Sequence, residues 1–428
     1  MSGHQRTGFT WETDLTDFTT PLARRYAWPE GHWNWPIKVS HKHGQRCGEM
    51  LWVGGQVDID STGVVLRPDD LAAQIPHAVA NLARVLEDLG AGLGDLVKLL
   101  VFYVSDQGLD EVQVREAIAR ALPASARIAL TLVPVPALAY QGMLVEIEGY
   151  AMLRHDGSAI NRQIAPHAPE DGVPEKFVRG LRAGKMLFLS AHSATPDVLS
   201  THPGDILVQT RSVIESLKST LTELGAGTED VVKLNRWYVG GGTEADFEPA
   251  ALACGATFKE PGPCATGIPV PELGAPGEMI RIEFVAMRGE DGSYLPRRHV
   301  WPETLWDWTI KLPYHHGLSC DGMIFLGGQV SLDKEGQALH PDDLAAQTRV
   351  AMAHIGTILN ELGADYRDVC KVTTFYSGEA DAERLHENLS IRSGYFSDPG
   401  PATTGIPLPV LAYPSMVVEI EIFAMIAS

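Results

Sequence analysis

The sequence predicts an α+β protein built from three tandem copies of one unit, each a β-sheet with two helices on one face. Two observations support this prediction. Segments of the chain repeat at fixed offsets, and each copy alternates strand-like and helix-like stretches. A sheet with helices on one face must cover its other face, and three such units can do so around an axis. We therefore expect an intramolecular pseudo-trimer with units at residues 26–154, 170–288 and 299–428.

The first and third copies share one register. Residues 28–152 repeat at an offset of 273 without an insertion. The segment PDDLAAQ stands at 68–74 and again at 341–347, and Glu146 aligns with Glu419. Chance does not hold one register over such a length, so the repeat predicts two units of the same fold.

The middle copy is more divergent but follows the same pattern. An offset of 135 aligns Lys98 with Lys233 and Thr131 with Thr266. The same offset places Arg281 opposite Glu146, so a charge of opposite sign replaces the glutamate in this copy.

Each copy predicts the order β-α-β-α-β. The first helix opens at acidic residues, which cap free N–H groups, and ends at Leu-Gly, where glycine adopts the left-handed cap conformation. A strand rich in β-branched and aromatic residues follows, then a second helix and a last strand. The first predicted strands are residues 50–57, 186–190 and 323–330, and the second are residues 96–104, 231–239 and 369–377.

Composition excludes several classes of protein. The net charge of −20 opposes binding to phosphate backbones, so we expect no nucleic-acid partner and no anionic membrane partner. Five cysteines without a CxxC pair argue against a disulfide framework and favour a cytoplasmic location. Residues 1–20 lack the apolar run of a signal peptide, and no run of 18 apolar residues occurs.

Three segments of the third copy carry a resemblance to a known family. The sequence reads Pro-Tyr at 313–314 followed by GMIFLGGQ at 322–329, then DVCKVTTFY at 368–376 and VEIEIFAM at 418–425. In this order and spacing they resemble the Rid family, the reactive intermediate deaminases. The resemblance implies a chorismate-mutase-like fold, trimers with pockets between subunits, and hydrolysis of enamines or imines. The chain looks like such a trimer fused into one polypeptide.

The resemblance implies a hydrolase acting on C–N bonds that needs no cofactor. Glu146 and Glu419 match the family glutamate and would handle protons. Tyr314 matches the family tyrosine, His41 takes its place in the first copy, and either would close a pocket from a neighbouring copy. The product would be a keto or enol acid plus ammonia. Some relatives act on 2-aminomuconate-type acids from aromatic degradation, which makes this substrate class a hypothesis.

The sequence departs from the family at the arginine that clamps the substrate. Its positions hold Thr131, Thr266 and Thr404, so the standard clamp is missing. Together with Arg281 at a glutamate position, this departure predicts three unequal pockets, of which one or two are active.

Residue chemistry leaves the glutamates open to two interpretations. A carboxyl group beside an apolar pocket has a raised pKa and can both donate and accept a proton during imine hydrolysis. Alternatively, Glu146 and Glu419 belong to the solvent-exposed face of a strand, where they alternate with isoleucine.

Further candidates would bind the substrate. The backbone N–H groups of Gly55 and Gly328 and the hydroxyls of Thr131 and Thr404 would hold a substrate oxygen, although packing glycines would look the same. A repeated aromatic and basic box forms either a wall for a planar acid or a hydrophobic clasp onto a neighbouring copy. Its members are Trp28, Trp33, Trp35, Lys38 and His43 in the first copy and Trp301, Trp306, Trp308, Lys311 and His316 in the third.

Arg236 is a charged residue in an otherwise apolar strand. With Arg281 it would bind a substrate carboxylate, or either arginine would pair with an acidic neighbour across an interface. Histidine and cysteine spacings match no metal motif, so we expect no metal.

The expected partner is a small molecule, a carboxylic acid by its chemistry, bound by a monomeric pseudo-trimer or a homo-oligomer of it. Two alternatives to deamination stay open at this point. They are a non-catalytic metabolite-binding or scaffold protein on the same fold, and a different hydrolase reaction on that fold.

Overall fold

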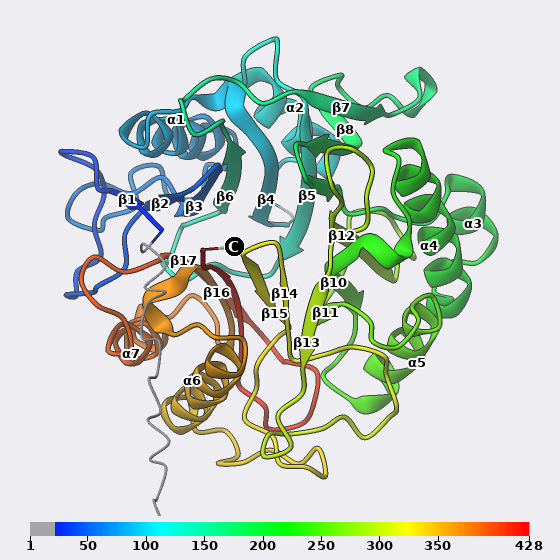
Figure 1. Ribbon diagram of the computed structural model, residues 1–428. Helices are drawn as coiled ribbons and strands as arrows, with labels where there is room; N and C mark the ends of the chain where they lie inside the picture. Colours follow the sequence, from blue (N-terminus) through cyan, green and yellow to red (C-terminus); the bar gives the residue numbers. More distant parts are fainter. Residues whose placement is uncertain (1–21, 106, 428) are drawn as a thin grey trace, which may run out of the picture.

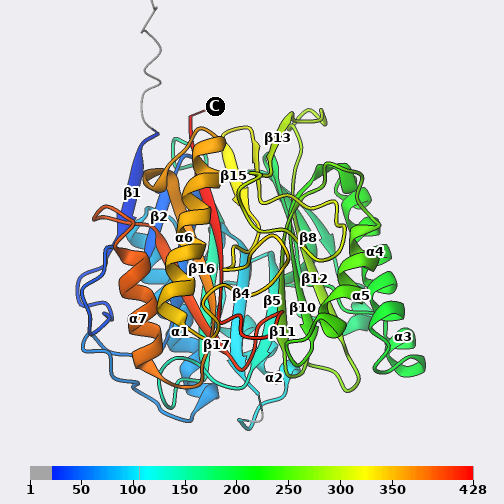
Figure 2. The same ribbon diagram turned by 90° about the horizontal axis from the view of Figure 1, so that it is seen from below.

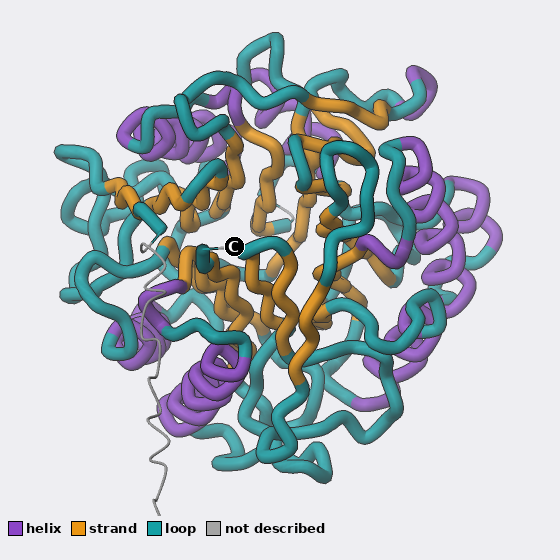
Figure 3. Tube along the Cα trace, in the orientation of Figure 1, coloured by secondary structure: helices purple, strands orange, loops and turns teal. Residues whose placement is uncertain are grey.

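A computed structural model describes residues 22–105 and 107–427. Residues 1–20, for which the sequence predicts no signal peptide, lie outside this part. Figures 1 and 3 show strands at the centre of the molecule and helices around its rim. Among the described residues, no helix combines the length and apolar character needed to cross a bilayer.

The first unit forms a six-stranded arrangement in the order β1-β2-β3-β6-β4-β5, with β4 and β5 parallel. Helices α1 and α2 contact each other and cover the outer face. The elements are β1 Arg24–Ala27, β2 Gly44–Cys47, β3 Met50–Gln56, α1 Leu71–Asp88, β4 Leu96–Val104, α2 Glu111–Ala121, β5 Ile128–Val135 and β6 Val145–Met152.

The second and third units repeat this arrangement, and Figure 2 shows their helices packed outside their strands. The second unit contains β7 Arg162–Pro166, β8 Phe177–Ala183, β9 Met186–Leu189, α3 Pro196–Thr201, α4 Ile206–Glu223, β10 Val231–Val239, α5 Glu244–Gly255, β11 Cys264–Val270 and β12 Ile280–Met287. The third contains β13 Arg297–Val300, β14 Gly317–Cys320, β15 Met323–Leu326, α6 Leu344–Glu361, β16 Val369–Ser377, α7 Ala382–Ser393, β17 Ala402–Leu408 and β18 Val418–Met425.

The α+β prediction is confirmed, and the strands β4, β10 and β16 begin and end at the predicted residues. The long helices begin directly after a capping aspartate; for example, Asp70 accepts a hydrogen bond from the Ala73 N–H. The structure adds hairpin strands at the start of each unit, such as β1 and β2, which the sequence did not reveal. Strands β1 and β2 are only four residues long and contain arginine or glycine, so they show no strand-like periodicity.

A buried glutamine in each long helix fixes the loop before the last strand. The Gln74 side chain donates to the Gly142 carbonyl at 2.7 Å and accepts from the Leu144 N–H at 2.8 Å. Gln209 and Gln347 make the equivalent bonds. These bonds satisfy backbone groups that would otherwise be buried without partners, and they hold the loop that lines the cavities described below.

The three units meet at three seams that use the same edges. Strand β5 of the first unit pairs with β8 of the second. The second unit meets the third where the Gly262 N–H donates to Pro313 at 2.8 Å, and the third meets the first where the Gly400 N–H donates to Ser40 at 2.7 Å. Contacts therefore run from the first unit to the second, to the third and back to the first (Figure 1).

Three buried lysine–glutamate pairs cross these seams near the centre. Each lysine lies on the middle strand of one unit and each glutamate on the last strand of another. The pairs are Lys98–Glu283 at 2.6 Å, Lys233–Glu421 at 2.8 Å and Lys371–Glu148 at 2.7 Å. All six side chains are 6% exposed or less, so each charge depends on its partner for the interactions that water would otherwise supply.

Candidate functional site

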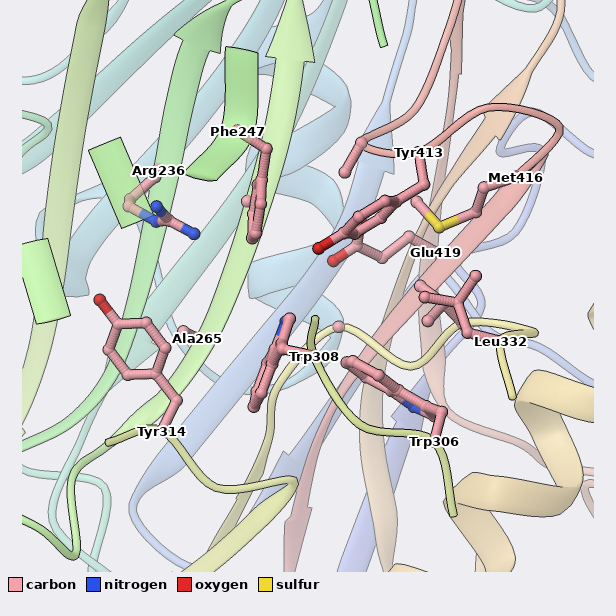
Figure 4. Close-up of a pocket in the computed structure, with 14 residues that line it drawn as sticks. Arg236, Phe247, Ala265, Trp306, Trp308, Tyr314, Leu332, Tyr413, Met416 and Glu419 are labelled. Carbon is pink, nitrogen blue, oxygen red and sulfur yellow. The ribbon is translucent and has the colours of Figure 1, made fainter. Parts of the chain in front are cut away.

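Two cavities with matching walls lie at two of the seams. The 3/1 pocket, of about 400 Å³, lies between the third and first units, and the 2/3 pocket, of about 390 Å³, lies between the second and third (Figure 4). One side of each pocket consists of repeat-related residues. In the 3/1 pocket these include Trp33, Trp35, Gly55, Tyr140, Met143 and Glu146; in the 2/3 pocket they are Trp306, Trp308, Gly328, Tyr413, Met416 and Glu419.

The two pocket glutamates are buried and have strongly raised pKa values. Glu146 on β6 and Glu419 on β18 are 7% and 5% exposed because a second unit covers the face of the strand that carries them. Burial, together with repulsion from the next glutamate along the strand, Glu148 or Glu421, raises the pKa of each carboxyl to about 8. The solvent-exposed interpretation is therefore wrong, and both carboxyls are mostly protonated at neutral pH.

The repeated glycines make room for these carboxyls. A Cβ atom on Gly55 would overlap the Oε1 atom of Glu146, and one on Gly328 would overlap Oε1 of Glu419. The predicted use of their N–H groups does not hold for Gly328, because its N–H donates to the Ala265 carbonyl at 3.1 Å. The glycines therefore shape the pocket around the glutamate.

We expect Gly55→Ala with Gly328→Ala to lower activity strongly and leave the fold intact. The added methyl groups meet only the ends of flexible side chains, so the carboxyls move and the backbone does not. Gly94→Ala is the control, because nothing lies within 4 Å of a Cβ there. Circular dichroism and ammonia release measure the two effects, and full activity in the double variant would contradict this role.

The tryptophan boxes line the pockets and are anchored within their own units. The indole N–H of Trp33 donates to Gln56 at 3.1 Å, and that of Trp306 to Gln329 at 3.3 Å. Trp35 and Trp308 face the cavities. The tryptophans therefore form a pocket wall, as one interpretation predicted. The hydrogen bonds that anchor them lie within their own unit and do not clasp a neighbouring copy.

The basic members of the box lie elsewhere. His43 stacks on Trp35 with ring centroids 5.2 Å apart, and His316 stacks on Trp301 at 4.0 Å, so both lie behind the tryptophans. Lys38 is exposed, and the Lys311 side chain is 89% exposed. None of these four residues is among those that line the two pockets, so their contact with a substrate stays a prediction.

Tyr314 and His41 occupy equivalent positions with different outcomes. Tyr314 lines the 2/3 pocket, but it belongs to the same unit as Glu419 and does not reach in from a neighbouring copy. His41 bonds the Pro401 carbonyl at 3.1 Å and is not among the residues that line the 3/1 pocket. Burial lowers its pKa well below the usual value, so this imidazole is neutral.

The two threonines serve the central ion pairs. Thr404 accepts a hydrogen bond from Lys371 at 2.8 Å, and Thr131 donates to Glu283. Their hydroxyls therefore face the centre of the molecule, and their predicted contact with a substrate oxygen is wrong.

Each pocket contains one buried arginine, and the two arginines come from different elements. Arg236 on β10 lies in the 2/3 pocket, where its guanidinium carbon is 4.9 Å from the Phe247 ring. Arg392 on α7 lies in the 3/1 pocket, where Asn388 and Thr403 hold it at 2.6 and 2.9 Å. Nε and Nη1 of Arg236 and Nη2 of Arg392 find no hydrogen-bond partner within the described residues.

Sequence reasoning missed Arg392. It lies within a helix whose polar residues look solvent-exposed, and the equivalent residue of the second unit is Cys254. Its only signal in the sequence is that α7 carries apolar residues at Leu385 and Leu389, which place Arg392 on the buried side of the helix.

Comparison with known proteins identifies the family. The family described as Endoribonuclease L-PSP matches residues 38–153 and 309–426, more than half of the chain. The chain belongs to this family, the Rid family. A RutC family protein from Pyrococcus abyssi is 31% identical over 94 residues, covering 22% of this chain and 72% of its own. The 2-iminobutanoate/2-iminopropanoate deaminase of Mus musculus is 30% identical over 113 residues, covering 26% and 81%.

Solved structures match as well. A YjgF/YER057c/UK114 family member from Mycobacterium tuberculosis is 24% identical and covers 31% of this chain and all of its own, with a TM-score of 0.26. A chorismatase is 13% identical and covers 77% of this chain and 93% of its own, with a TM-score of 0.49.

The middle unit of this Rid-family chain departs furthest from its two partners. The first/second seam opens into a cavity of about 1240 Å³, and Arg281 stands where the other pockets have glutamate. Its guanidinium bonds Glu111 of the first unit at 2.7 Å and Glu278 at 2.7 Å, so its charge is fully paired. The predicted joint site of Arg236 and Arg281 is therefore wrong: they lie at different seams, and Arg281 pairs across the interface.

Proposed function

We propose that the chain hydrolyses an imine or enamine of a carboxylic acid at the 3/1 and 2/3 pockets, giving a keto or enol acid and ammonia. One observation carries this proposal: each pocket joins a buried carboxyl with a pKa of about 8 to a buried arginine that has unpartnered N–H groups. Relatives named 2-iminobutanoate/2-iminopropanoate deaminases support this reaction type.

The glutamate carries the protons of the reaction. In its neutral form it donates a proton to the imine nitrogen, which makes the carbon electrophilic. Water adds to that carbon while the carboxylate takes the water's proton. The same proton then passes to the nitrogen, and the C–N bond breaks. Ammonia leaves as the carbonyl forms, and the hydroxyl proton returns to the carboxylate, which restores the acid form. One water is consumed, one ammonia is released, and the chemistry requires no redox cofactor.

The arginine holds the substrate carboxylate. A buried guanidinium without a paired charge is costly in the empty pocket, and an anion that reaches it removes that cost. With the glutamate neutral, each pocket carries one net positive charge, which binds one carboxylate of the substrate. A conjugated acid of the 2-aminomuconate type fits the tryptophan-lined walls and is the finer form of the proposal.

Removal of both arginines tests the proposal directly. An amino-acid oxidase generates imino acids in situ, and ammonia release above the spontaneous rate is followed. We expect Arg236→Ala with Arg392→Ala to lower kcat/KM by about 10- to 100-fold, mainly through KM, because a charged hydrogen bond is lost. Arg120→Ala is the control, since that side chain is 70% exposed. Wild-type kcat/KM in the double variant would overturn this role of the arginines.

The pH profile tests the glutamates. Because the acid form starts the reaction and burial raises the pKa of Glu146 and Glu419 to about 8, activity should stay level below pH 8 and decline above it. The decline should approach about tenfold per pH unit. Initial rates corrected for spontaneous hydrolysis measure it. A rise in rate between pH 7 and 9 would show that the ionised carboxylate is the form that starts catalysis.

A further inference from the structure

The two pockets share one wall and differ in the other. The wall that carries glutamate, tryptophans, tyrosine and methionine is largely repeated between the first and third units. It differs where Leu332 replaces Ile59 and where Tyr314 lines the 2/3 pocket. The opposite wall comes from the second unit in one pocket and from the third unit in the other. Any difference in substrate preference must therefore come mainly from this opposite wall.

In the 2/3 pocket the opposite wall carries an aromatic ring, since Phe247 of α5 lies 5.6 Å from the Tyr413 ring. Tyr314 of the third unit adds another ring 6.2 Å from the Trp308 ring, whereas its counterpart His41 does not line the 3/1 pocket. In Figure 4, Arg236 and Tyr314 lie at one end of the cavity and Glu419 at the other, with Phe247 and Trp308 between them. The imine carbon of an α-imino acid carries both the carboxylate and the side chain. With the carboxylate on Arg236 and the imine nitrogen beside Glu419, a flat side chain would extend from that carbon over the rings of Phe247 and Trp308.

In the 3/1 pocket the opposite wall is aliphatic. Leu385 of α7 takes the place of Phe247, and Leu389, one turn further along, also lines the cavity. Thr374 stands where the second unit has Arg236, and the guanidinium comes instead from Arg392 on the helix. The anion-binding group has therefore moved from the strand to the helix, and branched aliphatic surface fills the space where the other pocket has rings.

We infer that the two pockets take different substrates: the 2/3 pocket prefers imino acids with aromatic or conjugated planar side chains, and the 3/1 pocket prefers those with branched aliphatic side chains. This inference rests on the proposed function. Flat rings gain from stacking on Phe247 and Trp308, whereas a branched chain packs better against leucine. Contacts of this size change kcat/KM by about tenfold or more.

Variants that silence one pocket at a time test the assignment. Glu146→Gln leaves only the 2/3 pocket, and Glu419→Gln leaves only the 3/1 pocket. An amino-acid oxidase supplies the imines of phenylalanine and leucine. Relative to wild type, we expect Glu146→Gln to shift the phenylalanine-to-leucine ratio of kcat/KM upward and Glu419→Gln to shift it downward, with the two variants differing about tenfold or more. The same ratio in both variants overturns the inference.

A substitution in the opposite wall of the 2/3 pocket provides a second test. Phe247→Leu in the Glu146→Gln background should lower kcat/KM for the phenylalanine imine and leave that for the leucine imine within about twofold. An equal loss for both substrates would show that Phe247 supports the fold of the pocket without selecting the substrate, which also counts against the inference.

Failure of the proposed function is distinguishable from failure of the inference. If wild type does not accelerate ammonia release from either imine, the deaminase proposal fails. Binding of the corresponding keto acids, phenylpyruvate and 4-methyl-2-oxopentanoate, to Arg392→Ala and Arg236→Ala by calorimetry then decides the preference. Retention of the aromatic acid by Arg392→Ala and of the aliphatic acid by Arg236→Ala supports it, and any other pattern overturns it.

Discussion

Replacement of both pocket glutamates by glutamine, Glu146→Gln with Glu419→Gln, is expected to reduce ammonia release to the spontaneous rate and to stabilise the protein. Glutamine keeps the shape of the side chain but can neither donate nor take up the catalytic proton, so hydrolysis loses its acid and its base. The first/second seam cannot compensate, because Arg281 occupies the glutamate position there and its charge is paired.

The gain in stability follows from the raised pKa values. The pKa of each carboxyl is about 8 in the folded protein, against 4.5 for an unperturbed glutamate. Between these values the folded state binds more protons than the unfolded state, so glutamate makes stability fall as pH rises from 4.5 to 8. At pH 7 this amounts to about 3 kcal/mol per group. Glutamine does not ionise, so that dependence disappears.

Thermal unfolding at pH 5, 7 and 9 and ammonia release together check this prediction. The double variant should gain little at pH 5 and most at pH 9. Glu116→Gln is the matched control, because its side chain is 54% exposed and lies outside both pockets. A less stable double variant with normal activity would mean that the carboxyls serve the fold and take no part in the chemistry.

Lys371→Ala is expected to destabilise the protein by about 3–5 kcal/mol, because it leaves Glu148 buried and unpaired. Neither side chain of this pair has any exposed surface, so water cannot replace the lost partner without opening the seam. The exposed pair of Arg120 and Glu116 supplies the control, and Arg120→Ala should change stability by less than about 1 kcal/mol. Chemical denaturation measures both variants.

A paired substitution separates the charge from the packing. Lys371→Met with Glu148→Leu removes both charges and keeps apolar volume, so it should recover most of the stability that Lys371→Ala loses. If Lys371→Ala costs no more than Arg120→Ala, the central pairs do not hold the seams together, and the packing of the strands does.

The sequence predicted best those helices and strands whose structure depends on residues within the element itself. The long helices and the middle strands follow from local periodicity and capping, and the repeat offset matched Glu146 with Glu419 before any geometry was known. The contacts between units could not be read in this way, because they depend on which strand of one copy faces which strand of the next. Lys371 and Glu148 illustrate this limit: both positions repeat, yet only the seam shows that one bonds the other.

The two pocket arginines show the same limit. Arg236 could be predicted as a site residue because a charged side chain in an apolar strand needs a partner, whereas Arg392 resembles an ordinary polar residue of a helix. Arg236 lies on β10 and Arg392 on α7, so their shared place in the pockets depends on how each unit packs against its neighbour, which the sequence alone does not display.

Because the three seams are built from one continuous chain, a substitution alters a single seam. In an assembly of identical subunits, an arginine at the glutamate position would appear three times and remove every carboxyl at once. Here Arg281 occurs once, and the other two cavities keep their glutamates. Because the units are linked in one polypeptide, mutations can change the residues at one seam without changing those at the other two. The sites can therefore diverge while the buried lysine–glutamate pairs at the centre stay the same.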